Sequence, residues 1–183
     1  ERYTLAADGT YQAYAVTGTS TFGAPVDESF RRDGDQVQWK TTSDQGSMAA
    51  SGRQLYLPMS ATPAGLSVAM GALAGAEGGT LALLPHGTLR MHDVATVDLR
   101  QGRERRTVRL VALDGMGLSP TYAWATTDTR PRLFAFIIPG YVQLVEEGWE
   151  DVGATLQARQ ERAENEDLAQ RQQRLANPVE GAL

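Results

Sequence analysis

The sequence contains no cysteine, a single lysine (Lys40), two histidines and no long apolar run. Without cysteine the chain can form neither a disulfide framework nor a zinc site with thiolate ligands. The absence of cysteine fits a reducing and an oxidising compartment equally well. No stretch approaches the ~20 apolar residues that span a bilayer, so no transmembrane helix is predicted. The scattered basic residues form no stripe that could neutralise a row of phosphates, and nucleic-acid binding is therefore not expected.

What the chain has is enough apolar material for one ordinary domain. It holds 183 residues, of which 42% are hydrophobic, and a chain of this size can bury a sizeable core. The net charge of -5 is mild, and most of it lies in residues 141–176, where eight acidic residues face four arginines. The rest of the chain is therefore close to neutral.

Short alternating segments separated by turn residues dominate the first two thirds of the chain. "RYTLAA" and "YQAYAVTG" flank Asp8-Gly9, and "ESFRR" and "QVQWKTT" flank residues 33–35, as in β-hairpins. Further strands are expected at 47–51, 54–57, 80–84 and 88–99 and within "RRTVRLVAL", "TYAWATTD" and "RLFAFII". The pattern predicts an antiparallel sheet of about eight to ten strands.

Two helices are predicted. In the first, at 62–76, Thr62 is expected to act as the N-cap and Pro63 to take the first helical position. The second is expected over 140–178, with Val145, Trp149, Val152 and Leu156 on one buried stripe. Beyond Gln157 the same stripe becomes polar, and so long a helix would reach roughly 50 Å. We therefore expect a single domain over residues 1–157 and a protruding helix end and linker over 158–183.

These elements together predict the fold class. We expect an α+β fold in which a curved antiparallel β-sheet, open like a half-barrel, is covered by one short helix and one long C-terminal helix.

The two histidines, His86 and His92, are the first candidates for a metal site, with Asp93 as a third ligand. Residues six apart on a strand lie about 20 Å from each other, which is too far for joint coordination. We interpret His86 as a turn residue and His92 as a surface residue of a strand, and we predict no metal ligand.

Other motifs also favour structural roles. The run "GALAGAEGG" (71–79) lacks the Lys-Ser/Thr pair of a phosphate-binding loop and follows a helix, so we interpret it as a helix end and connector. No G-x-S-x-G motif occurs, and the paired carboxylates suit solvated faces and helix starts. "QGRERR" (101–106) is expected at a hairpin tip, and Trp39, Trp124 and Trp149 are expected in the core. No catalytic or cofactor-binding residue is predicted.

The C-terminal third resembles a known family. "SPTYAWATTDTRPRLFAFIIPGYVQLVEEGWEDVGATLQARQ" (119–160) is similar to the segment that precedes the catalytic barrel in a group of bacterial amidohydrolases with an additional N-terminal domain. The matching features, in order, are Pro120, Trp124, Leu133-Phe134-Ala135 and Gly148-Trp149-Glu150. "TFGAPVDESFRRDG" and "VQWK", earlier in the chain, fit the same upstream domain.

The resemblance implies a non-catalytic accessory or scaffolding domain of a larger metal-dependent hydrolase. The parent would act on C–N bonds through a divalent metal of zinc type, held only in a C-terminal barrel domain of the same polypeptide, because this chain has no His-x-His pair and no repeated β-α pattern. "ANPVEGAL" (176–183) would be the linker to that barrel. A homo-oligomer and a periplasmic or secreted location are further expectations. A chain that opens on Glu1 without Met fits a processed or a truncated protein.

Two alternatives remain open. The first is a periplasmic carrier that holds an apolar lipid or acyl ligand in the concave sheet, as lipoprotein carriers do. Flexible methionine side chains could line its pocket (Met48, Met59, Met70, Met91 and Met116). The second, an enzyme active as the isolated chain, is the least favoured because no catalytic set was found.

Overall fold

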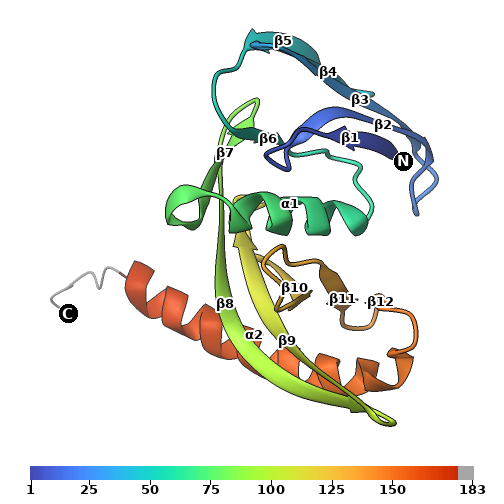
Figure 1. Cartoon of the computed structure of the whole chain (residues 1–183), viewed down its shortest axis with the longest axis vertical. Coiled ribbons are helices and arrows are strands. Elements are labelled where there is room, and N and C mark those ends of the chain that lie inside the picture. The colour runs from blue at the N-terminus through green and yellow to red at the C-terminus, as the bar shows by residue number, and fades with distance from the viewer. Residues whose placement is uncertain (177–183) are drawn as a thin grey trace, which may run out of the picture.

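The computed structural model describes residues 1–176 and has the expected α+β class, with two α-helices and two β-sheets (Figure 1). The first sheet, here called the N-terminal sheet, is an antiparallel meander in the order β1-β2-β3-β4-β5. Its strands are β1 (Arg2–Leu5), β2 (Tyr11–Thr19), β3 (Pro25–Asp33), β4 (Gln36–Lys40) and β5 (Gln45–Ala49). The predicted hairpins are present, and Gly9 and Gly34 adopt the positive φ that their turns require.

The second sheet, here called the main sheet, has the order β12-β11-β10-β9-β8-β7-β6. Its strands are β6 (Gln54–Tyr56), β7 (Thr80–Leu84), β8 (Thr88–Gln101), β9 (Glu104–Asp114), β10 (Thr121–Thr126), β11 (Leu133–Ile138) and β12 (Val142–Val145). Figure 1 shows the long β8 and β9 curving together, and their hairpin ends at the predicted "QGRERR" tip. The sheet does not close into a barrel, since β12 and β6 form its two edges.

Residues 1–176 therefore contain twelve strands in two sheets, where the sequence predicted one sheet of eight to ten strands. The second sheet begins with a parallel pair, β6 and β7, connected by α1 (Ala64–Ala74) and the short 3₁₀ helix η1 (Glu77–Gly79). Parallel neighbours need a crossover connection, which a helix usually supplies. The expected helix at 62–76 is this crossover.

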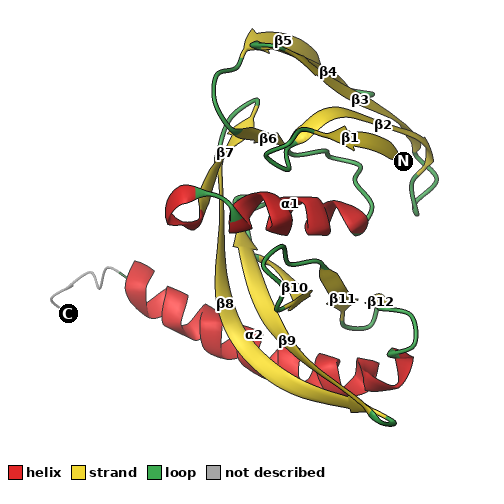
Figure 2. Cartoon of the chain, viewed as in Figure 1, coloured by secondary structure: helices red, strands yellow, loops and turns green. Residues whose placement is uncertain are grey.

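The elements stack in the order N-terminal sheet, α1, main sheet, α2 (Figure 2). A first core lies around α1 and joins aromatic residues of the N-terminal sheet, such as Tyr14 and Phe30, to the near face of the main sheet. A second core lies between the opposite face of the main sheet and α2. Trp124 and Trp149 are buried in the second core, whereas Trp39 is half-buried against the first.

Helix α1 is buried on most of its surface. The expected Leu66, Met70 and Leu73 are buried, but so are Val68 and Ala69. A helix that is apolar all round belongs between two layers, and α1 lies between the two sheets. Its start differs from the prediction, because Pro63 occupies the N-cap position and no side chain caps the helix.

Helix α2 (Gly153–Leu175) begins later than predicted. The expected helical start at 140 is wrong, since Val145 belongs to strand β12 and a 3₁₀ turn, η2 (Glu150–Val152), leads into the helix. Gly140 and Gly148 have φ values of 75° and 81°, a left-handed conformation that interrupts a helix and suits turns. At 1.5 Å per residue, the 23-residue helix is about 35 Å long.

The second half of α2 lies on the main sheet, so the prediction that the helix protrudes from residue 158 is wrong. Gln160 is 1% exposed, Ala163 is buried and Asp167 is 8% exposed. The polar side chains on this stripe face protein groups that accept or donate hydrogen bonds to them, as shown below. Residues 177–183, most of the predicted linker, lie outside the described residues. Within residues 1–176, neither helix is long and apolar enough to cross a membrane.

Candidate functional site

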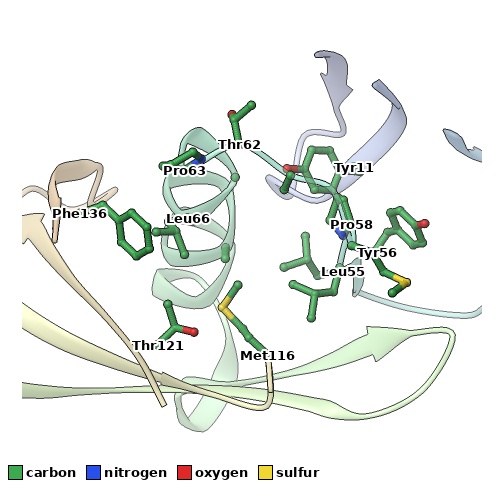
Figure 3. A pocket seen from close by; sticks show the side chains of 15 residues that line it. Tyr11, Leu55, Tyr56, Pro58, Thr62, Pro63, Leu66, Met116, Thr121 and Phe136 are labelled. Atoms are coloured by element: carbon green, nitrogen blue, oxygen red, sulfur yellow. The ribbon is translucent and has the colours of Figure 1, made fainter. Parts of the chain in front are cut away.

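An apolar cleft with a volume of about 430 Å³ lies beside the first half of α1. We call it the α1 cleft. Figure 3 shows Phe136 and Leu66 on one side of it, Tyr11, Leu55 and Tyr56 on the other, and Met116 and Thr121 below the helix. Volumes of roughly 300–1,000 Å³ with apolar walls are typical of small-molecule sites.

One rim of the α1 cleft is the segment that connects β6 to α1. Glu28, on β3 and only 2% exposed, anchors it from within the protein. Its carboxylate accepts hydrogen bonds from the Tyr56 hydroxyl (2.7 Å) and from the backbone N–H groups of Met59 (2.9 Å) and Ser60 (2.8 Å). A buried carboxylate is tolerated when its acceptor sites are filled in this way. Glu28 thus fixes the shape of the rim.

The opposite wall of the α1 cleft contains a polar atom without a partner. The hydroxyl of Tyr11 is buried and forms no hydrogen bond to any described residue. The Tyr11 hydroxyl lies close to the start of α1. A Cβ atom built on Gly65 would lie 3.7 Å from the hydroxyl oxygen. Tyr14, the neighbouring tyrosine of β2, also has an unpartnered hydroxyl, but it does not line the cleft.

A second polar constellation lies on the other side of the main sheet, where α2 crosses it. We call it the α2 clamp: His92, Asp114, Tyr122, Asp167 and Arg171. Asp167 accepts hydrogen bonds from the Tyr122 hydroxyl (2.8 Å) and from Arg171 Nε (2.8 Å), and its Oδ1 lies 3.2 Å from His92 Nε2. Arg171 Nη1 also donates to Asp114 Oδ1 (2.6 Å).

The electrostatics of the α2 clamp indicate that it holds the helix on the sheet and does not act as a reactive centre. Burial by itself would raise the pKa of Asp167, but the hydrogen bonds from Arg171, Tyr122 and His92 outweigh burial and hold that pKa below its usual range. Burial and the hydrogen bond to Asp167 together raise the pKa of Tyr122. The hydroxyl of Tyr122 therefore stays protonated and donates to Asp167. Both oxygens of Asp167 are occupied, so the clamp fixes α2 to β8, β9 and β10.

The structure separates the residues that the sequence offered as a metal site. His86 lies in the β7–β8 turn, His92 belongs to the α2 clamp, and Asp93 forms an ion pair with Arg109 (2.8 Å). Residues 1–176 contain no group of three or more His, Cys, Asp or Glu side chains placed to hold a metal ion.

The other sequence motifs have structural positions. Gly75 is the C-cap of α1, and Gly78 and Gly79 belong to η1, so the glycine-rich run connects α1 to β7 as predicted. Arg106, near the tip of the β8–β9 hairpin, pairs with Glu146 and lies over the Trp149 ring, 5.0 Å from its centroid. This part of the basic hairpin is therefore engaged within the fold.

Sequence reasoning missed Glu28 as an anchor, Tyr11 as an unpartnered donor and the whole α2 clamp. One local signal for the clamp was present, since the buried stripe of α2 continues at helical spacing from Leu156 through Gln160 and Ala163 to Asp167 and Arg171. Nothing local marks Tyr11 or Glu28, because their environment is formed by residues distant in sequence.

Comparison of the chain with protein-family models, with curated proteins and with solved structures found no match. The assignment of a function therefore depends on the geometry above and on the resemblance of residues 119–160.

Proposed function

We propose that this chain is a non-catalytic accessory domain of a larger amidohydrolase-like, metal-dependent hydrolase, and that it acts there as a scaffold beside the catalytic barrel. The segment with the family resemblance supports the proposal, because it forms one continuous part of the fold: β10, β11, β12, η2 and the first turns of α2. Its Trp124, Phe134 and Trp149 are all buried in the second core.

The observation that carries the proposal is an exposed apolar strip on this same segment. Ile138, Val142 and Leu144 share one face of the β11–β12 hairpin, as Ile138 pairs with Val142 and Leu144 pairs with Phe136. Ile138 and Leu144 are 41% and 45% exposed, and Tyr141 in the turn is more exposed still. An exposed apolar edge strand promotes aggregation unless another surface covers it. A neighbouring barrel domain would provide that cover.

In this proposal the divalent metal and the catalytic residues belong to the barrel domain of the same polypeptide, which would be periplasmic or secreted. The second half of α2 is not an argument for a missing partner domain, because the main sheet covers one side of this half.

The test uses the polypeptide that joins this chain to the sequence downstream of it. A barrel with a His-x-His motif is expected there, and the β12 amides should exchange more slowly in the joined polypeptide than in the isolated chain. Leu144→Asp should weaken this protection, whereas Phe22→Asp, at an exposed residue of the β2–β3 turn, should not. A downstream frame without a barrel, or equal exchange of β12 in both forms, would refute the proposal.

A second candidate is a carrier of an apolar lipid or acyl ligand, and the α1 cleft is the observation that favours it. Residues of β2, β6, α1, β10 and β11 line the cleft. Of the five methionines proposed for such a pocket, Met59 and Met116 line it, whereas Met48, Met70 and Met91 do not. Extraction of the chain purified from its own cells, followed by mass spectrometry, should then recover a stoichiometric apolar compound. An accessory domain without ligand would yield none.

A further inference from the structure

The unpartnered hydroxyl of Tyr11 indicates what the α1 cleft would recognise. Tyr11 is 2% exposed, and its ring is held edge-on between Tyr3 and Tyr14, at centroid distances of 5.5 and 5.4 Å. Figure 3 shows its hydroxyl directed from β2 toward the start of α1. Buried donors are nearly always hydrogen-bonded. The Tyr11 hydroxyl has almost no accessible surface, so an acceptor would reach it through a small shift of the cleft wall, and an acceptor is expected at this position.

The charges around the α1 cleft argue against an anionic headgroup. None of the fifteen described residues that line the cleft is Arg, Lys or His. The nearby carboxylate of Glu1 accepts a hydrogen bond from the Thr62 N–H (3.1 Å), which places negative charge at the rim. Burial, reinforced by Glu1, raises the pKa of Tyr11, so its hydroxyl keeps the proton and acts as a donor. A buried anion without a positive partner is strongly disfavoured.

The remaining walls favour an apolar body. Leu55, Leu66, Met116 and Phe136 are among the apolar residues that line the cleft, and Met116 offers an adaptable thioether side chain. Phe136 pairs with Leu144 of β12, so the exposed strip adjoins this wall of the cleft.

We infer that the α1 cleft binds a small, uncharged, apolar molecule that presents one carbonyl-type acceptor to the Tyr11 hydroxyl. This inference deepens the second candidate function and depends on it. An ester, ketone or amide of an aliphatic chain has the required chemistry, whereas a free fatty acid, ionised at neutral pH, does not.

The test is displacement of diphenylhexatriene, a neutral hydrocarbon fluorophore without an acceptor, from the whole chain at pH 8. Decan-2-one, decanoate and decane are compared as competitors, since they differ in acceptor and charge at similar length. Decan-2-one should compete at least about fivefold better than decanoate. In Tyr11→Phe its affinity should fall about five- to tenfold, as expected for one neutral hydrogen bond, with that of decane unchanged.

Tyr14→Phe is the matched control, because it removes the other unpartnered hydroxyl of the same strand without touching the cleft. It should leave all three affinities unchanged. Neither variant should lower the stability of the free chain, since neither hydroxyl has a hydrogen bond to lose, and urea melts verify that both fold. Met116→Trp should fill the cleft and abolish binding of the fluorophore.

The possible failures are distinguishable. Binding of the fluorophore with equal competition by decan-2-one and decane, or with Tyr11→Phe unchanged, would overturn the acceptor inference and leave an apolar carrier standing. Preference for decanoate would overturn it as well. Absence of binding, or binding that Met116→Trp does not affect, would remove the carrier function and this inference together. Self-association of the wild type that Met116→Trp prevents would make a second copy the occupant and also overturn it.

Discussion

The two faces of the main sheet differ in how the elements above them are packed. On the α2 face, Trp124, Ile137 and Leu156 form a closed core, and the α2 clamp ties the helix to three strands. On the α1 face, the packing leaves a cleft of about 430 Å³ and a buried tyrosine hydroxyl without a described partner. The α2 face is thus filled by its core, with a hollow beside the α2 clamp that His92, Asp114, Arg171 and Arg174 help to line. The α1 face has an apolar cleft, and the site of function is expected there.

The largest effect that tests this contrast is expected from truncating one aromatic residue on each face. Trp149→Ala, in the closed core, should lower the free energy of unfolding by about 3–5 kcal/mol. Phe136→Ala, half-buried beside the cleft, should cost only about 1–2 kcal/mol, because less surface returns to water. Urea melts measure both, with Leu168→Ala, 40% exposed on α2, as a control of less than about 0.5 kcal/mol. Equal losses for the two aromatic residues would contradict the contrast.

A smaller effect concerns the rim of the α1 cleft. Glu28→Gln should destabilise the chain by about 1–3 kcal/mol, because the amide nitrogen would face an N–H or O–H donor that the carboxylate now satisfies. Asp27→Asn, at the adjacent exposed residue, should change stability little. Urea melts and amide exchange of Met59 and Ser60 check this expectation. A variant with unchanged stability and unchanged exchange would show that Glu28 does not hold the rim.

The smallest effect is expected from the α2 clamp, and it should depend on pH. Asp167→Asn should cost about 1–2 kcal/mol at pH 7 through its charge-assisted hydrogen bonds. The folded-state pKa of Asp167 is lowered from 3.8, so the carboxylate stabilises the fold above that value and the contribution is lost as pH falls through the lower folded pKa. Wild type and variant should therefore converge in stability below about pH 4. A constant difference down to pH 2 would rule out this role.

The sequence predicted the local parts of the fold well and the distant ones poorly. Hairpins at Asp8-Gly9 and Gly34 were found because turn residues and alternation act over a few positions. The division into two sheets was not, since the crossover through α1 depends on which strands pair, and pairing carries no local mark. Strand β12 was assigned to a helix because Val145 and Trp149 mimic helical spacing, which Gly148 interrupts.

The candidate sites show the same division. Spacing predicted a turn position for His86 and a strand position for His92, as the structure has them, but the α2 clamp joins residues 75 positions apart, such as His92 and Asp167. Gln160 lies in the half of the helix that was expected to protrude because its stripe becomes polar there. In the fold its side-chain N–H donates to the Ile137 carbonyl (2.9 Å), while its buried Oε1 has no partner among the described residues, so the sheet satisfies this polar residue only in part.

The most direct test of the closed side is native-state amide hydrogen exchange along α2 in the isolated, monomeric chain. If the main sheet and the α2 clamp hold the helix, amides around Ala163 and Asp167 should be protected to nearly the same degree as those that follow Leu156. Tyr122→Phe should loosen only the second half. Amide exchange in residues 158–171 that is orders of magnitude faster than in the first half of α2 would contradict the account. It would indicate that this half of the helix needs a missing domain to cover it.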